Sequence, residues 1–243
     1  MLLMAVAKTI TSQSEMTPEY RQTLVQMMES QAYRELAAAV MFGDGLKHVP
    51  SLKWLKFMTW HINEEMEHYE AVCRMYQEFT GASVEPIVND RLGKKPIPFA
   101  TSWFELAMAQ FLYDRGGFWQ LQEYGGCSYV PYRNVVEKII EEERGHQSLG
   151  ERIVVDLVKT GDYEAVKQPM FDRWFRMGML SFGRPNTPGN RYAMEVGLKK
   201  RDSGDVMQDF ITDIKPCMRA CGLKFQPVET WGLDVPAGLD LAL

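Results

Sequence analysis

Several features that would assign this chain to particular classes are missing from its sequence. The net charge is −5 and no block of Lys and Arg occurs, so nucleic acid is not expected as a partner. The opening MLLMAVA is too short for a signal-peptide core with its flanks and too short to span a bilayer. We therefore expect no membrane association and a cytoplasmic location.

Cysteine is also scarce, and the four cysteines lack the paired spacing of a secreted disulfide framework. Cys217 and Cys221 lie one helical turn apart and could form a redox pair. Ordinary buried thiols are the simpler interpretation, because free cysteine is among the most buried residue types. The scarcity agrees with a reducing compartment.

No stretch of any length shows the alternation of apolar and polar residues that is typical of β-strands. Apolar residues recur instead with helical period, which predicts an all-α protein. The 243 residues suffice for one domain, 1–243, with a core bundle over about 17–160 and C-terminal helices with an extended tail over about 161–243. Residues 1–16 are expected to form a loose arm.

Capping residues, glycines and prolines delimit the expected helices. Thr17 and Ser51 can cap helix starts, and Gly81 can end a helix. The stretch 81–99 is expected to be a crossover loop between two helical hairpins, and 181–190 a further loop. The expected helices cover about 17–42, 51–80, 101–124, 131–159, 163–180 and 204–220.

Two Glu-x-x-His pairs stand where the apolar rhythm predicts buried positions. They are Glu65 with His68 and Glu143 with His146. Side chains three residues apart share one face of a helix. Burying them without partners would be costly, roughly 2–7 kcal/mol for a neutral polar group and more for a charge. A bound metal ion is the simplest compensation.

Each pair is preceded by one acid in the same kind of apolar stripe. Glu65 follows Glu35 by 30 residues, and Glu143 follows Asp114 by 29. Four antiparallel helices would bring the two halves to one height in the core. Four carboxylates and two imidazoles are the ligand set of carboxylate-bridged di-iron and di-manganese bundles. Such donors suit iron or manganese and leave positions open for O₂.

A set of solvated or ion-paired acids is the alternative to a metal centre. Asp114 could pair with Arg115 or another cation instead of a metal. Glu105 and Glu123 flank Asp114, but their offsets of 38 and 20 residues from Glu143 break the repeat.

Three further residues lie near the expected ligands. Glu64 and Glu142 each precede a ligand Glu and could accept the outer N–H of a ligand histidine on the opposite helix. Solvated surface acids are the other interpretation. His61, one turn before Glu65, could lie beside the ligands, although an ordinary polar helix position is the simpler interpretation. His48 lies in a turn and is expected to be exposed.

Several segments carry a family resemblance. The run 34–81 with EEMEH at 64–68, the run 112–146 with CSYVPY at 127–132 and EEERGH at 141–146, and FGRPN at 182–186 resemble the catalytic subunit of phenylacetyl-CoA epoxidase. The resemblance covers most of the chain. It implies a ferritin-like fold and iron ligands at Glu35, Glu65, His68, Asp114, Glu143 and His146.

The resemblance also implies an activity and its partners. Members of this family add one oxygen atom from O₂ to the ring of an aryl-acyl-CoA thioester. They use a di-iron centre, a homologous metal-free sister subunit, small accessory subunits and a separate reductase. We therefore expect an oligomer with such partners. The chain departs from the family at His61, where a lysine is usual, and at Arg115, where a glycine is usual.

Three functions are compatible with these features. The first is a di-iron oxygenase component that acts on an aromatic substrate, with an aryl-acyl-CoA as the expected form. The second is a ferritin-like iron-binding or ferroxidase protein, and the third is a non-catalytic scaffold subunit. Lys47, Lys53, Lys56 and Arg91 are the candidate cations for CoA phosphates.

Overall fold

The computed structural model describes residues 8–95, 97–143 and 145–243, except for the side chain of residue 147. The opening MLLMAVA, Pro96 in the expected crossover loop and Arg144 within EEERGH lie outside the described residues. In the described ranges the chain is helical and contains no strand; one isolated bridge joins Ile10 and Tyr129. None of the described helices is long and apolar enough to cross a bilayer.

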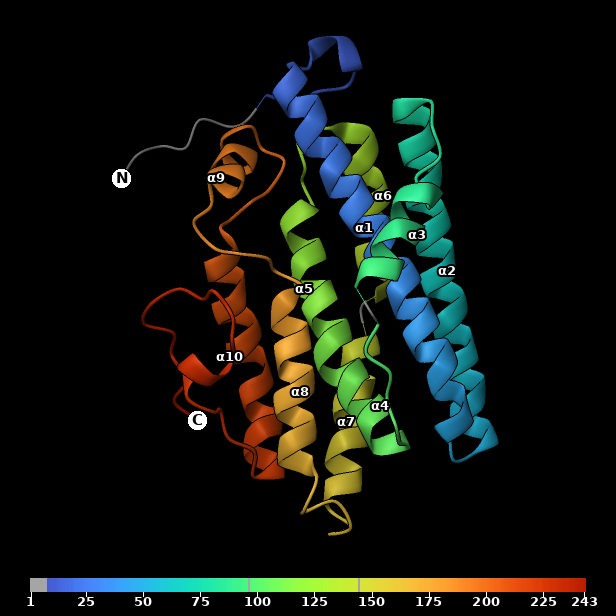
Figure 1. The fold of residues 1–243 in the computed structure, drawn as a ribbon, viewed down its shortest axis with the longest axis vertical. Coiled ribbons are helices and arrows are strands. Elements are labelled where there is room, and N and C mark those ends of the chain that lie inside the picture. The colour runs from blue at the N-terminus through green and yellow to red at the C-terminus, as the bar shows by residue number, and fades with distance from the viewer. Residues whose placement is uncertain (1–7, 96, 144) are drawn as a thin grey trace.

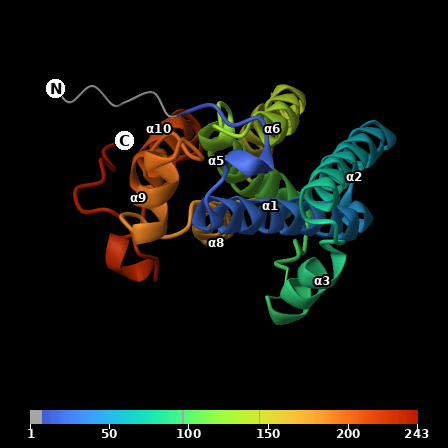
Figure 2. The same cartoon turned by 90° about the horizontal axis from the view of Figure 1, so that it is seen from above.

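The core is a bundle of four antiparallel rods, seen side by side in Figure 1 and from above in Figure 2. The first two rods are single helices joined by a short turn, and the third and fourth are each interrupted once. The elements are α1 (Pro18–Gly45) and α2 (Leu52–Thr80), then α4 (Trp103–Ala109), η3 (Gln110–Asp114) and α5 (Arg115–Tyr124), then α6 (Val130–Glu143) and α7 (His146–Val158). The all-α bundle expected from the sequence is confirmed.

The predicted capping residues begin and end the first two rods. Thr17 and Ser51 are extended, and their side chains accept hydrogen bonds from the backbone N–H groups three residues further on. Gly81 ends α2 in the left-handed conformation, at φ 77°. These short-range signals explain why both helix starts and the end of α2 could be located from sequence.

Three expectations about loops and helices were wrong. The stretch 81–99 is not only loop, because it contains α3 (Glu85–Lys94), which begins with an acidic first turn and Pro86. The expected helix 131–159 is broken at Gly145, whose φ of 126° no helix interior allows. The expected loop 181–190 includes the start of α9 (Pro188–Glu195), capped by Thr187.

Two further helices cover one side of the bundle. They are α8 (Lys167–Leu180) and α10 (Ser203–Cys221), which pack against the third and fourth rods and lie away from α2 in Figures 1 and 2. The helix expected over 163–180 is present as α8, but it begins at Lys167, four residues later than predicted. The tail after α10 carries the 3₁₀ turn η4 (Val228–Thr230).

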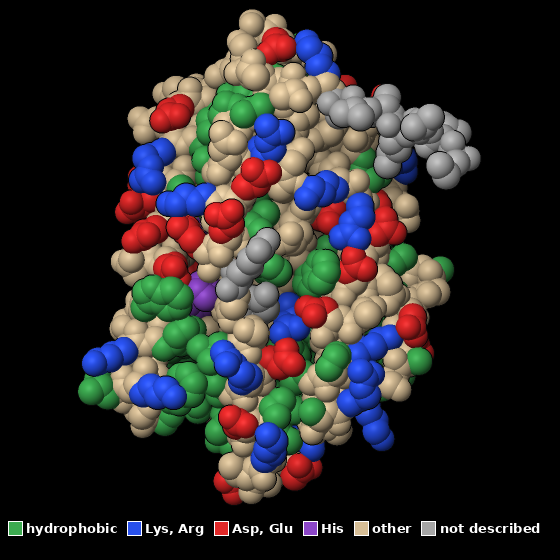
Figure 3. Space-filling model, turned by 180° about the vertical axis from the view of Figure 1, so that it is seen from behind, with side chains coloured by type: hydrophobic (Ala, Val, Ile, Leu, Met, Phe, Trp, Pro, Cys, Tyr) green, Lys and Arg blue, Asp and Glu red, His purple; other side chains and the backbone are tan. Residues whose placement is uncertain are grey.

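Figure 3 shows that hydrophobic and basic side chains gather over the start of α2, where Leu52 and Trp60 are exposed.

The CSYVPY stretch at 127–132 joins the N-terminal arm to α9. Ser128 exchanges a 2.7 Å hydrogen bond with the hydroxyl of Tyr20 and donates to the backbone of Val196 at 2.8 Å. The backbone of Ile10 bonds to residues 128 and 130 on either side of the bridge to Tyr129. This stretch therefore ties the arm to the bundle.

The core consists of two apolar clusters with a polar layer between them. One cluster includes Phe42, Met58, Phe104 and Val154, at the end of the bundle where α1 passes into α2. The other occupies the opposite end. Every rod contributes to both clusters, so the residues between the two contributions lie at mid-height. These are the segments that carry the predicted ligands.

The third rod is held by close backbone contacts with α8. A Cβ atom placed on Gly116 would lie 2.7 Å from the backbone oxygen of Gly178. A Cβ atom on the next residue, Gly117, would meet nothing within 4 Å. The two glycines are adjacent in one helix, but only Gly116 is needed for packing.

We predict opposite effects from alanine at these positions. Gly116→Ala should lower the free energy of unfolding by about 1–3 kcal/mol, because both backbones must move apart. Gly117→Ala should raise it by roughly 0.5–1 kcal/mol through helix propensity. Chemical denaturation of the two variants measures both values. Equal effects would contradict the close contact.

Candidate metal centre

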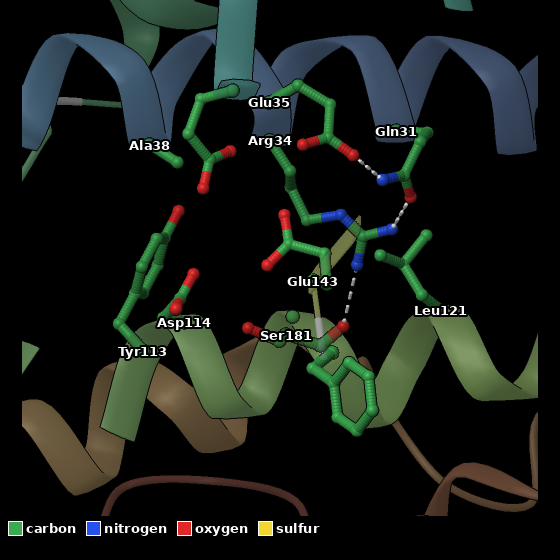
Figure 4. A pocket seen from close by; sticks show the side chains of 12 residues that line it. Gln31, Arg34, Glu35, Ala38, Tyr113, Asp114, Leu121, Glu143 and Ser181 are labelled. Carbon is green, nitrogen blue, oxygen red and sulfur yellow. Dashed lines mark hydrogen bonds between the residues drawn. The ribbon is translucent and has the colours of Figure 1, made fainter. Parts of the chain in front are cut away.

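The six predicted ligand residues meet at mid-height in the bundle. Figure 4 shows Glu35, Asp114 and Glu143 entering one cavity from different helices. Each of the six residues is at most 7% exposed. Glu35 comes from α1, Glu65 and His68 from α2, Asp114 from the last position of η3, Glu143 from the last position of α6, and His146 from the first position of α7.

The two interruptions of the bundle occur at the ligand positions. The segment η3 is π-helical, so its turn is wider than an α-helical turn and it changes the direction in which Asp114 projects. The break at Gly145 separates Glu143 from His146, yet His146 Nδ1 still lies 3.1 Å from Glu143 Oε2. Both irregularities therefore serve to place side chains in the polar layer.

The ligand atoms form two groups. Glu35, Glu65, His68 and Glu143 offer atoms that all lie within 4.8 Å of one another, and so do His61, Asp114 and His146. Glu143 contacts a histidine of each group, because its Oε1 lies 3.1 Å from His68 Nδ1 and its Oε2 contacts His146. Its two oxygens therefore face the two groups, so Glu143 could contact a metal ion held by either one.

Buried atoms without hydrogen bonds test whether a metal fits. His68 Nδ1 and Asp114 Oδ2 are buried and have no hydrogen-bond partner. His68 Nδ1 is close to Glu143 Oε1, but not in hydrogen-bonding geometry. Two ligand atoms about 2.1 Å from one ion and at right angles would be about 3 Å apart. The oxygen-rich donor set and these distances fit a pair of iron or manganese ions.

Two acids contact the outer nitrogens of the histidines. His68 Nε2 lies in hydrogen-bonding contact with Glu142 Oε2 at 3.2 Å. His146 Nε2 lies 2.9 Å from Glu64 Oε2, an ion-pair distance outside hydrogen-bonding geometry. In both cases the acid comes from the helix opposite its histidine and precedes a ligand Glu. Such contacts orient an imidazole so that its other nitrogen faces a metal. The Glu64 and Glu142 side chains are 17% and 33% exposed, so neither is a fully solvated surface acid.

His61 does not occupy an ordinary polar helix position, which was the simpler interpretation of the sequence. Its side chain is fully buried, with Nε2 3.0 Å from Glu65 Oε1. Its ring centre lies 4.4 Å from that of His146. Burial and the nearby His146 lower the pKa of His61 to about 3, so the ring is neutral. His48 is half-buried, not exposed as expected.

The other acids of the third rod are engaged elsewhere. Glu105 bonds to Arg173 and Trp174 Nε1, and Glu123 accepts 2.8 Å hydrogen bonds from Arg201. Arg115, the cation considered as a partner for Asp114, donates to Glu151 and Asp213 instead. Asp114 is thus the acid of this rod that faces the cluster.

Protons balance the charge of the metal-free cluster. Burial raises the pKa of Glu35 and, together with neighbouring carboxylates, raises those of Glu65 and Asp114 well above their usual values. Burial also acts to raise the pKa of Glu143, but the hydrogen bond with His146 and the close positive charges of His146 and His68 outweigh it and hold that pKa low. Burial lowers the pKa of His68 and His146, yet contacts with Glu143 and other acids raise both to about 9.

A small cavity adjoins the cluster. Its volume is about 40 Å³, and Glu35, Glu65, Asp114 and Glu143 line it. A neighbouring pocket of about 460 Å³ shares Arg34, Tyr113 and Ser181 with this cavity. The other residues lining the pocket are Tyr33, Ala37, Lys94, Lys95, Ile97, Pro98, Met177 and Leu180.

Fold and site together define a helical-bundle protein with buried carboxylate and histidine clusters that could hold metal ions. The chain matches the family "Phenylacetic acid catabolic protein" over residues 4–233 and belongs to it. It is 23% identical, over 229 residues, to one of the subunits of 1,2-phenylacetyl-CoA epoxidase from Escherichia coli (strain K12). The match covers 88% of this chain and 72% of that protein. The family resemblance expected from the sequence is confirmed.

We predict that Asp114 and Glu123 differ in their effect on metal binding. Asp114→Asn should weaken ferrous ion binding about tenfold or more, because changes even outside the ligand set typically cost 10–100-fold. Glu123→Gln should leave the affinity unchanged, since its carboxylate bonds to Arg201 away from the cluster. Anaerobic titration of both variants measures this difference. The reverse ranking would show that Asp114 is not a ligand.

We also predict a pH dependence of stability in the metal-free protein. Raised folded-state pKa values of His68 and His146 stabilise the fold fully below pH 6.5, and this contribution is lost as pH rises toward about 9. The melting temperature should therefore fall between pH 6.5 and 8.5, on the order of 10 °C. Differential scanning calorimetry at fixed ionic strength measures the fall. Metal-loaded protein should show a smaller fall, and a rising apoprotein curve would contradict the charge assignment.

Proposed function

We propose that this protein is the catalytic component of a di-iron monooxygenase that acts on an aryl-acyl thioester. The observation that carries the proposal is the complete buried set of four carboxylates, which line one small cavity, and the two histidines in the same layer. A non-catalytic scaffold protein has no need of such a costly buried set. Membership of the phenylacetic acid catabolic family and the similarity to one chain of an epoxidase support the same class of reaction.

The residues that would hold the two metal ions are those of the buried layer. Glu35 and His68 face one position, Asp114 and His146 the other, and Glu65 and Glu143 lie between. Two bound iron ions would supply the activation of O₂. The four carboxylates carry four negative charges, which would balance two divalent ions.

A hydrogen-bonded chain positions Glu35 from the pocket side. Arg34 donates to the backbone oxygen of Ser181 at 3.1 Å and to Gln31 Oε1 at 2.8 Å. Gln31 in turn donates to Glu35. Arg34 also lines both the small cavity and the larger pocket. It is therefore placed to orient the carbonyl of an acyl group whose ring lies next to the cluster.

The larger pocket suits an apolar acyl group with an anionic carrier. Ile97, Pro98 and Met177 are among the apolar residues that line it, and Lys94 and Lys95 supply exposed positive charge. Lys94 is itself paired with Asp90 at 2.7 Å, so ion pairing does not separate it from the cations considered from sequence. Those cations lie elsewhere in the structure: Lys47 pairs with Asp44 and Arg91 with Glu29. Neither these nor Lys53 or Lys56 lines the pocket. We assign the role of contacting CoA phosphates to Lys94 and Lys95.

The proposed reaction balances as a monooxygenation. One atom of O₂ forms two C–O bonds across a ring C–C bond and gives an epoxide. The other atom leaves as water and requires two electrons and two protons. A separate reductase would supply the electrons, and a homologous metal-free protein would complete the complex. The name of the relative, which marks it as one chain of a larger epoxidase, supports such an assembly.

Hydrogen peroxide allows a test without the reductase, because it supplies the oxygen atom and the oxidising equivalents and leaves water. Protein loaded with ferrous iron and then oxidised in air to the ferric state, alone and with its copurified partners, is mixed with phenylacetyl-CoA and peroxide. Mass spectrometry should detect a product heavier by one oxygen atom. Glu143→Ala should abolish both iron binding and product. Iron oxidation with O₂ uptake but no product would favour a ferroxidase, and absence of iron binding would favour a scaffold.

Binding of the thioester tests the pocket separately. Calorimetric titration should show that phenylacetyl-CoA binds more tightly than free phenylacetate and that rising salt weakens this binding. The double variant Lys94→Glu, Lys95→Glu should bind the thioester about tenfold more weakly or worse, without a change for phenylacetate. The matched control is Lys53→Glu, Lys56→Glu, which alters two lysines outside the pocket. Equal effects of the two pairs would reject the assigned pocket.

A further inference from the structure

His61 is the buried histidine that the six-residue ligand set leaves unused. It lies one helical turn before Glu65 on α2, and its side chain is fully buried. Its Nε2 points into the polar layer, 3.0 Å from Glu65 Oε1 and 3.9 Å from Asp114 Oδ1. A solvated helix position would show none of these contacts. The ring therefore belongs to the cluster.

We propose that His61 is a third imidazole ligand of the metal centre, on the side of Asp114 and His146. This inference rests on the di-metal centre of the proposed function. His61, Asp114 and His146 offer ligand atoms that all lie within 4.8 Å of one another, as do those of the group around His68. His61 would thus complete a second ligand group beside the one formed by Glu35, Glu65, His68 and Glu143.

The surroundings of His61 hold its ring in this orientation. Phe42 and Phe57 pack against it, with ring centres at 4.7 and 6.0 Å, and the ring of His146 lies on another side. Gln110, in the π-helical segment η3, is 1% exposed and places its side-chain Nε2 3.3 Å from His61 Nδ1. The other ring nitrogen, Nε2, is thus directed at the cluster.

Gln110 allows the histidine to exist in either tautomer. Without metal, Gln110 donates to Nδ1, and the Nε2–H of His61 donates to Glu65. The side-chain amide carries a donor and an acceptor, so a half-turn presents its oxygen to Nδ1. Nδ1 can then carry the proton, and the Nε2 lone pair is free to bind a metal ion. Ligating histidines generally donate their other N–H to such an acceptor.

Charge balance also favours a neutral extra ligand. Four carboxylates already match the charge of two divalent ions, so a further anion would leave buried negative charge uncompensated. An imidazole adds a donor atom without adding charge. The ligand group around Asp114 and His146 then contains two imidazoles, and the group around Glu35 contains one.

Cobalt(II) loading tests this inference without any enzymatic assay. Each imidazole bound to high-spin cobalt gives one far-shifted, exchangeable ring N–H resonance, which disappears in D₂O. With ¹⁵N-labelled histidine, the unmodified protein with two cobalt ions should show three such resonances, from His61, His68 and His146. His61→Gln should show two. The matched control is His48→Gln, the histidine outside the cluster, which should keep three.

Affinity gives a second measurement. His61→Gln should weaken binding of one of the two cobalt ions, roughly 10–100-fold, and leave the other nearly unchanged. Two bound ions with only two resonances in the unmodified protein would overturn the inference and leave the di-metal proposal standing. Failure to bind any metal would overturn the proposed function itself. The number of resonances in the unmodified protein tells whether His61 binds a metal ion, even if the His61→Gln variant does not fold.

Discussion

The structure depends on keeping acidic groups together in the middle of a helical bundle. Two like charges 4 Å apart repel by about 4 kcal/mol at an effective dielectric constant of 20. Four carboxylates share one buried layer here, so positive charge must accompany them. In the metal-free protein, protons on His68 and His146 provide it, together with protons retained by the carboxyl groups. The apolar clusters above and below confine this charge to one level.

Much of the fold could be predicted because its signals are local. Thr17, Ser51 and Gly81 reveal their helix ends within one turn of sequence. The missed features depend on contacts across the bundle or on a single backbone angle. Nothing in the residues 131–159 shows that Gly145 adopts a positive φ, because a glycine also occurs inside helices. The π-helical turn at Gln110–Asp114 likewise has no sequence pattern of its own.

The candidate site was predictable where residues repeat and not where they stand alone. Two Glu-x-x-His pairs with a preceding acid single out six residues, and the structure brings those six together. A lone histidine such as His61 has no repeat to distinguish it, so its burial and the position of Gln110 are visible only in three dimensions. The pocket lysines were missed for the same reason, since α3 brings them near Arg34 across the chain.

The crossed contacts of Glu64 and Glu142 bear on how such a chain can change over generations. Glu142 on α6 contacts His68 on α2, and Glu64 on α2 contacts His146 on α7. Each hairpin therefore supplies the orienting acid for the histidine of the other. If the halves arose by duplication, they could not change independently, because a substitution of Glu64 or Glu142 alters the contact made by a histidine of the opposite half. These two acids therefore couple the two halves of the repeat.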